Sequence, residues 1–236
     1  MRVLVTGANR GIGLELVRQL VARGDEVDAV ARSQAEVIYD GGSNAKPDPI
    51  TGSIGNVRVY RCDVTDDAAV RALASELGDA ALDLVINNAG VGGGDRQSQN
   101  SMDFAEALKT FDVDALGPLR VSLALLPHLR RGRVKKLVHL TSGLGSIGDN
   151  RSGGFYAYRM AKAALNMMSK NLAVELRGEG IASYVINPGW VQTDMGGAHA
   201  AITPAESVKG ILSRIDTATL DQTGEFLDWK GGRYPY

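Results

Sequence analysis

The sequence contains little that would place the protein outside a reducing, aqueous compartment. Its only cysteine is Cys62, so no disulfide can form within the chain, as is usual where thiols are kept reduced. No apolar run approaches the roughly 18 residues that a membrane-spanning helix needs. The apolar part of the N-terminal stretch Met1–Gly7 is too short for a signal peptide. We therefore expect a cytoplasmic protein with no membrane partner.

The numbers of positive and negative side chains are nearly equal, and the sequence shows no pattern of metal ligands. Its 26 Lys and Arg residues balance 27 Asp and Glu residues, whereas proteins that bind nucleic acid or anionic membranes usually carry a basic surface. His128, His139 and His199 show no ligand spacing with one another or with Cys62. We therefore predict no nucleic-acid partner and no catalytic metal.

Internal repeats are absent, and short β-branched apolar runs instead alternate with longer segments of helical periodicity. Most of these runs are apolar throughout, which is typical of strands covered on both faces. The order predicts a single doubly wound α/β (Rossmann) domain over residues 1–236, with a mostly seven-stranded parallel sheet and helices on both faces. The expected strands are Arg2–Thr6, Glu26–Ala31, Val57–Arg61, Leu82–Asn87, Lys136–Thr141, Ile181–Asn187 and, more weakly, Gly224–Leu227. The expected helices begin near Gly11, Asp66, Met102, Phe155 and Pro204.

A glycine-rich turn, Thr6-Gly7-Ala8-Asn9-Arg10-Gly11-Ile12-Gly13, follows the first expected strand and opens a helix. Gly7 permits a tight turn, while Gly11 and Gly13 let the backbone approach a pyrophosphate at the positive end of that helix. No Lys-Ser or Lys-Thr follows the glycines, which excludes a P-loop. Plain strand–helix packing also uses such turns, so the dinucleotide interpretation depends on its context.

The end of the second expected strand carries Arg32, where an NAD-binding chain would place an acidic residue on the adenosine ribose. An arginine there would attract a 2′-phosphate, and Arg10 could reach the same group. Asp28 is acidic but lies in the middle of the strand. These positions favour NADP(H) over NAD(H). The irregular segment Ile38–Asn56 that follows is predicted to be a surface loop, either a tolerated insertion or a wall beside the cofactor's adenosine end.

Four motifs together resemble the signatures of the short-chain dehydrogenase/reductase family. They are the glycine turn, Asn87-Asn88-Ala89-Gly90, Tyr158-Arg159-Met160-Ala161-Lys162 and Asn187-Pro188-Gly189, in the family's order. The resemblance covers essentially the whole chain. Segments Tyr156–Met168, Pro188–Gly197 and Phe226–Tyr236 are most similar to the C-factor-like and carbonyl-reductase-like branch.

This resemblance implies a nucleotide site that runs from the glycine turn to the nicotinamide pocket. Asp63 has an alternative role, because Asp63-Val64-Thr65-Asp66 could simply cap the next helix; we expect Asp66 to be the cap and Asp63 the adenine contact. The implied cofactor residues are Gly7, Asn9, Arg10, Gly11, Ile12, Gly13, Arg32, Asp63, Val64, Asn88, Ala89, Gly90, Tyr158, Lys162, Pro188, Gly189, Val191 and Thr193.

Tyr158 and Lys162 are four residues apart, which places both side chains on one helix face. Tyr156 is a competing tyrosine, but Met160 stands four residues after it. The Lys162 ammonium and a nicotinamide cation would favour the phenolate of Tyr158; lowering its pKa by two to three units needs roughly 3–4 kcal/mol. Tyr158 is therefore the predicted general acid and base.

Ser142 follows the fifth expected strand, where its hydroxyl could bond the substrate oxygen. Thr141 and Ser146 are competitors, and capping of a turn is the alternative role; the spacing from Ser142 to Gly145 matches the family's Ser-x-x-Gly. One position departs from the family, which commonly has an Asn that supports a proton relay where this chain has Asp114. This change would remove an amide donor, retune proton transfer or alter the local helix.

The leading prediction is hydride transfer between NADP(H) and a small to medium carbonyl or alcohol substrate. The alternative is an NADP(H)-binding signalling or regulatory protein with little turnover. A nucleotide-sugar epimerase is disfavoured because about 45 residues after Pro188 leave no room for a substrate domain, and Lys162 disfavours a dehalogenase. Trp190, Met195 and Gly196–Ile202 could form a lid, although core packing would equally explain Trp190.

Oligomeric state is the remaining expectation. The expected helices Met102–Arg131 and Phe155–Arg177 have broad apolar faces, which either pair in a homodimer or homotetramer or pack against the sheet.

Overall fold

The computed structural model describes residues 1–32, 53–54 and 56–236. Most of the predicted loop Ile38–Asn56 therefore lies outside the described residues. Two residues of that segment, Ser53–Ile54, form the short strand β3, which pairs antiparallel with β4. The prediction of loop throughout the segment is wrong at this point, because two residues are too few to give a strand pattern in the sequence.

The main sheet has the strand order β10-β9-β8-β5-β1-β2-β4-β3, and every pair except β3–β4 is parallel. This confirms the predicted seven-stranded, doubly wound parallel sheet, to which β3 adds an edge. The parallel strands are β1 (Arg2–Thr6), β2 (Glu26–Ala31), β4 (Val57–Arg61), β5 (Leu84–Asn87), β8 (Lys136–Leu140), β9 (Ala182–Asn187) and β10 (Phe226–Asp228). Each of their bounds lies within two residues of the predicted ones.

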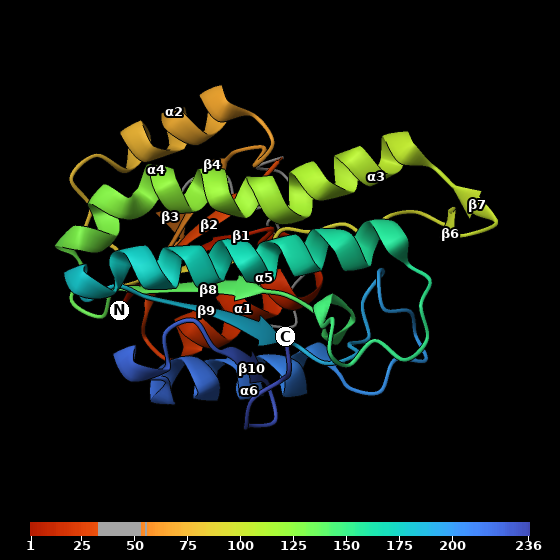
Figure 1. The fold of residues 1–236 in the computed structure, drawn as a ribbon. Helices are drawn as coiled ribbons and strands as arrows, with labels where there is room; N and C mark the ends of the chain where they lie inside the picture. The colour runs from red at the N-terminus through yellow and green to blue at the C-terminus, as the bar shows by residue number, and fades with distance from the viewer. Residues whose placement is uncertain (33–52, 55) are drawn as a thin grey trace.

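Helices cover both faces of the sheet (Figure 1). One face packs α1 (Gly11–Ala22) and α6 (Pro204–Thr217) around a core that includes Val3 and Val5. The other face packs α2 (Asp67–Leu77), α4 (Gly117–Arg131) and α5 (Tyr156–Leu176) around Leu4 and its neighbours. The alternation of β1 side chains between two buried cores explains why the strands are apolar throughout.

The helix expected to start near Met102 is divided. Met102 belongs to β7 (Ser101–Met102), which pairs with β6 (Gln97–Ser98) in a separate two-stranded sheet. Helix α3 (Phe104–Phe111) follows, with the Asp103 carboxylate accepting from the Glu106 N–H as its N-cap. A π-helical turn, Asp112–Leu116, then joins α3 to α4, and it is this turn that carries Asp114.

Polar side chains link the middle strands through the core. Asn87 on β5 contacts His139 Nδ1 on β8 at 3.1 Å, and His139 Nε2 contacts Ser183 Oγ on β9 at 3.3 Å. Ser183 in turn contacts Ser169 Oγ on α5 at 2.9 Å. These residues are all buried, so the chain of contacts satisfies polar groups that would otherwise be costly in the core.

His139 should make the protein sensitive to mild acid. Burial lowers its pKa to about 3, below the unfolded value near 6.5, so the stability that this difference contributes is present above pH 6.5 and lost as the pH falls towards 3. Between pH 7 and 5 the free energy of unfolding should drop by about 2 kcal/mol through this residue. Urea unfolding of wild type and His139→Asn at both pH values measures the difference. The exposed His199, changed to Asn, is the control; equal losses in wild type and His139→Asn would contradict this origin.

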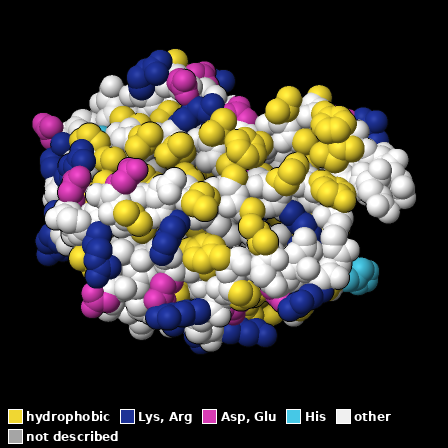
Figure 2. All heavy atoms as spheres, viewed as in Figure 1, with side chains coloured by type: hydrophobic (Ala, Val, Ile, Leu, Met, Phe, Trp, Pro, Cys, Tyr) yellow, Lys and Arg dark blue, Asp and Glu magenta, His cyan; other side chains and the backbone are white. Residues whose placement is uncertain are grey.

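Exposed apolar side chains gather on the face formed by α3, α4 and α5 (Figure 2). They include Phe104, Leu108, Leu123, Met160, Met167 and Val174. The expectation of a homodimer or homotetramer rests on this surface, whereas the inward sides of α4 and α5 pack against the sheet. Within the described part of the chain, no helix is long and apolar enough to cross a membrane.

Candidate active site

The glycine turn between β1 and α1 brings bare backbone to the carboxyl edge of the sheet. Gly7 and Gly11 have φ values of +65° and +52°, which side chains rarely tolerate. A Cβ on Gly13 would lie 2.0 Å from the Gly7 carbonyl oxygen. The side chain of the N-cap residue Arg10 makes no capping hydrogen bond, and the first turn of α1 has no acidic residue. The N–H groups and the positive end of this helix therefore suit an anion.

The end of β5 holds this turn in place. The hydroxyl of Thr6 accepts from the N–H groups of Asn88 and Ala89 at 3.0 and 3.1 Å. The Asn88 amide donates to the carbonyl oxygens of Thr6 and Gly7 at 2.9 and 3.1 Å. Asn88 thus braces the two strand ends, a role beyond the cofactor contact that the resemblance implied.

The expected adenosine end of the site contains Arg32 and Asp63. Arg32 is exposed just beyond β2, and Asp63 accepts from the Thr65 N–H and hydroxyl at 3.0 and 2.8 Å. Burial would raise the pKa of Asp63, but the Thr65 hydrogen bonds and the Arg32 charge lower it overall. Asp66 accepts from two N–H groups at the start of α2 and is its N-cap, as expected.

The other two charged groups considered for this end have partners elsewhere. Arg10 forms an exposed ion pair with Asp194 at 2.7 Å. The sequence did not predict this pair, because the two residues are 184 positions apart. Asp28 is fully buried within β2 and pairs with Arg2 at 2.7 Å. This buried position agrees with the prediction that Asp28 does not contact the ribose.

Tyr158, Lys162 and Asn166 project at successive turns of α5, which packs against β9 and the turn after β8. The Lys162 ammonium is buried, lies 5.5 Å from the centre of the Tyr158 ring and donates to the Leu140 carbonyl at 3.2 Å. The Ser142 hydroxyl acts to lower the pKa of Tyr158 and accepts from the Leu144 N–H at 3.1 Å. The three predicted catalytic side chains therefore meet, with Ser142 also capping its own turn.

The competing hydroxyls and the competing tyrosine have other surroundings. Thr141 donates to the Asn166 amide oxygen at 2.6 Å, and the Ser146 hydroxyl accepts from the Asp149 N–H at 3.0 Å. Tyr156 is 44% exposed. Of these three hydroxyl residues, Ser142 is the one that acts on the pKa of Tyr158.

Asp114 lies directly against this pair. Its fully buried carboxylate accepts from the Val91 N–H at 2.8 Å and forms an ion pair with Lys162 Nζ at 3.1 Å. The pKa of Tyr158 is raised in this structure: burial raises it most, Lys162 opposes, and Asp114 adds to the rise. The lowering expected from Lys162 together with a nicotinamide cation stays a prediction, and the Asp114 carboxylate beside the lysine would work against it.

Two residues outside the expected set organise the Ser142 turn. Asn187, at the end of β9, accepts from the Gly143 N–H at 3.1 Å and donates to Asp228 on β10 at 2.9 Å. Tyr234 donates to Asp149 at 2.9 Å, and its hydroxyl leaves no room for a side chain on Gly143. Asn187 was visible in the Asn-Pro-Gly motif; nothing in the sequence pattern indicated Tyr234.

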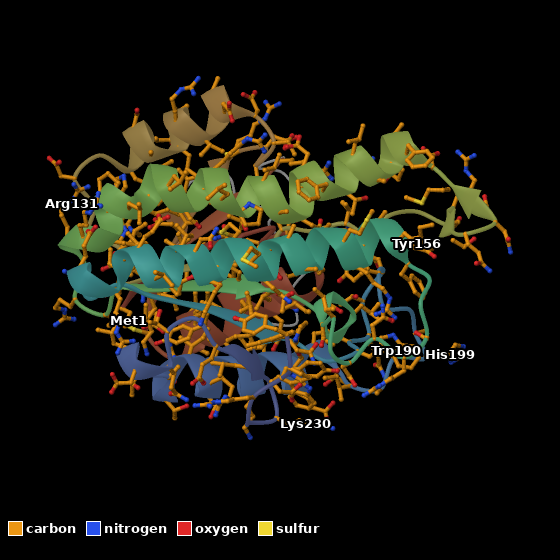
Figure 3. The ribbon with its side chains drawn as sticks, viewed as in Figure 1. Met1, Arg131, Tyr156, Trp190, His199 and Lys230 are labelled. Carbon is orange, nitrogen blue, oxygen red and sulfur yellow. The ribbon has the colours of Figure 1, made fainter. Side chains whose placement is uncertain are left out.

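One cleft of about 1510 Å³ connects these parts. It runs from Arg32 and Asp63 past the glycine turn to Tyr158, and its far end is lined by Trp190 and Met195. Trp190 is 59% exposed and donates to the Gly196 carbonyl at 2.8 Å, so core packing does not explain it. Figure 3 shows Trp190 and His199 at the same end of the molecule as Tyr156. All the implied cofactor residues lie on this cleft.

Known proteins share both the sequence and the fold. The C-signal of Myxococcus xanthus is 44% identical over 172 residues, which span 71% of this chain and 100% of that protein. A 1-hydroxy-2-glutathionyl-2-methyl-3-butene dehydrogenase of Rhodococcus sp. (strain AD45) is 36% identical over 95% of this chain and 94% of its own length.

Among solved structures, the carbonyl reductase Sniffer of D. melanogaster superimposes with a TM-score of 0.88 at 27% identity, over 100% of this chain and 99% of the other. The NADPH-bound carbonyl reductase from chicken fatty liver gives 0.85 at 29% identity, over 100% and 98%. The sequence model of the family described as short chain dehydrogenase matches residues 1–201. The chain therefore belongs to the short-chain dehydrogenase/reductase family of oxidoreductases.

Proposed function

We propose that the protein is an NADP(H)-dependent reductase of small to medium carbonyl compounds. The observation that carries the proposal is the single cleft that joins the glycine turn to Ser142, Tyr158 and Lys162. Such a cleft at the carboxyl edge of a parallel sheet suits a nucleotide and a small substrate side by side.

The residues present suit a dinucleotide. Gly7 and Gly11 have positive φ values, which glycine adopts readily. Gly13 has no Cβ, which lets its backbone pack against the Gly7 carbonyl oxygen. The start of α1 would hold the pyrophosphate, with Asp63 and Val64 at the adenine and Pro188 to Thr193 at the nicotinamide. When bound, the nicotinamide exchanges a hydride with the substrate carbon.

The side chains of this protein would handle the proton. Tyr158 would donate its hydroxyl proton to the carbonyl oxygen during reduction. Ser142 would hydrogen-bond the same oxygen as negative charge develops on it. Lys162 would stabilise the phenolate that remains and bind the ribose beside it.

The preference for NADP(H) rests on Arg32. It is exposed just beyond β2, lines the cleft and follows Ala31, so the described end of this strand carries no acidic residue for the ribose. Arg10 is tied to Asp194 by an exposed pair, which a phosphate could replace at little cost. The NADPH bound to the chicken carbonyl reductase supports the same preference.

The test follows NADPH absorbance with a panel of aldehydes, ketones and diketones, with NADH run in parallel. We expect carbonyl-dependent loss of NADPH, with kcat/KM at least tenfold lower for NADH. Changing Arg32 to Ala should raise KM for NADPH by about 10- to 100-fold through loss of a charge-assisted contact, and leave NADH nearly unchanged. Arg71, exposed on α2 outside the cleft, provides the control as Arg71→Ala. An equal loss for both cofactors would refute the assigned role of Arg32.

The similarity to the C-signal favours a second candidate, an NADP(H)-binding signalling protein with little turnover. Tight NADPH binding without turnover on any carbonyl of the panel would support this candidate over the reductase.

A further inference from the structure

A buried carboxylate beside the catalytic lysine is the feature that the proposed reaction does not use. Asp114 is held from two sides, by the Val91 N–H at 2.8 Å and by Lys162 Nζ at 3.1 Å. A Cβ on Gly90 would lie 3.4 Å from the carboxylate and 3.5 Å from the ammonium. The ion pair thus lies beside the Gly90 backbone, and Gly90 and Lys162 line the cleft.

The two charges of this ion pair act on Tyr158 in opposite directions. Burial raises the pKa of Asp114 although the Lys162 charge and the Val91 N–H oppose this rise, and Asp114 in turn raises the pKa of Lys162 although burial would lower it. The ion pair at 3.1 Å holds both charges beside Tyr158. Tyr158 therefore faces a cation and an anion together. A buried ammonium alone would favour the phenolate, whereas a neutralised one does so much less.

The other groups packed around Tyr158 and Lys162 are uncharged. The strand β8 contributes the Leu140 carbonyl and the turn after it contributes the Ser142 hydroxyl. The loop after β5 contributes the Val91 N–H. Asp112, in the same π-helical turn as Asp114, is paired with Arg120 at 2.7 Å. Within the described residues, the charges acting on Tyr158 are those of Lys162 and Asp114.

We propose that Asp114 is a positioning residue: it neutralises the Lys162 ammonium, keeps Tyr158 in its proton-donating form and so sets the upper pH limit of carbonyl reduction. The inference rests on the proposed function. In reduction, the carbonyl carbon receives hydride from NADPH while its oxygen takes the Tyr158 proton, and the phenolate regains a proton from solvent. In oxidation, the phenolate must first be present to accept the proton of the alcohol.

The test is the pH profile of kcat/KM for wild type and Asp114→Asn in both directions. Removing the negative charge should move the falling limb of reduction, and the rising limb of oxidation, to lower pH by about one to two units. Oxidation at neutral pH should accordingly become about tenfold faster. Asp112→Asn, in the same turn, is the matched control and should move neither limb. Lower activity with unmoved limbs would show that Asp114 is merely structural and overturn the proposal.

A second readout does not depend on turnover. The phenolate of Tyr158 is titrated by ultraviolet difference spectroscopy in Asp114→Asn and wild type, with the Tyr158→Phe spectra subtracted. The midpoint should fall by the same one to two units; an unchanged midpoint would overturn the proposal even if no carbonyl substrate is found. Asp114→Ser, which keeps an oxygen acceptor without the charge, serves the same titration if the Asn variant does not fold.

Discussion

Changing Tyr158 to Phe should lower kcat/KM for carbonyl reduction by roughly 10²- to 10⁴-fold, or about 3–5 kcal/mol of transition-state stabilisation. The substitution removes only the hydroxyl that would transfer the proton and keeps the ring that packs beside Lys162 at 5.5 Å. NADPH affinity should therefore change little, because the glycine turn and Arg32 are untouched. Steady-state kinetics with the best substrate of the carbonyl panel measure the first effect, and fluorescence titration with NADPH measures the second.

The matched control for this prediction is Tyr156→Phe. Tyr156 lies two residues before Tyr158 and is 44% exposed. Met160, and not a lysine, stands one helical turn after it. It should retain nearly full activity. If Tyr158→Phe kept more than about a tenth of the wild-type rate, another group would have to supply the proton, and the assignment of Tyr158 would fail.

Changing Gly13 to Ala should remove the nucleotide site and much of the stability around it. The new Cβ would lie 2.0 Å from the Gly7 carbonyl oxygen and 2.5 Å from the Asn88 amide nitrogen, so the backbone of the glycine turn would have to move. We expect a loss of about 3–5 kcal/mol in the free energy of unfolding, as for other severe overpacking. Any folded fraction should bind NADPH at least about 100-fold more weakly.

Gly178 offers a control for that substitution. It lies in the short turn after α5, and a Cβ there would meet nothing within 4 Å. Gly178→Ala should change the unfolding free energy by less than about 1 kcal/mol. Chemical unfolding and NADPH titration of both variants test the comparison; similar behaviour of the two would mean that the close approach at Gly13 is not what the turn requires.

The sequence predicted most of the sheet because its strands are buried on both faces. Residues 3–5 of β1, for example, are continuously apolar and buried, and Gly7 marks where that strand ends, so the position of the strand follows from the local sequence. The strand Ser53–Ile54 and the hairpin before α3 were missed because each strand has only two residues, too few to give a hydrophobic period.

The division of the Met102–Arg131 segment was not predictable in the same way. The backbone is helical without a break from α3 to α4, and the π-helical turn Asp112–Leu116 lies between them. No loop between the two helices therefore marks the division. In the sequence, Asp114 is notable only because the family commonly has an Asn at its position. Its ion pair with Lys162 joins elements far apart in the sequence, and such a contact depends on tertiary packing that local patterns do not encode.

For the site itself, motif positions placed Ser142, Tyr158 and Lys162 at strand ends and on one helix face, and parallel strands then bring them together. The sign of the shift in the pKa of Tyr158 needed the structure, because it depends on the sum of burial and two opposite charges. Likewise, the Arg10–Asp194 pair joins two loops whose proximity is a product of folding.

The support of the Ser142 turn by Asn187 and Tyr234 has a consequence for how the protein is made. The glycine turn and its brace at Asn88 belong to residues synthesised early and are complete once β5 has paired with β1. The turn that carries Ser142 is fixed by contacts with residues of β9 and with Tyr234, which leave the ribosome much later. The part of the proposed nucleotide site around the glycine turn is thus synthesised well before the part around Ser142 and Pro188. A reductase built in this way would become competent only after Tyr234 has left the ribosome.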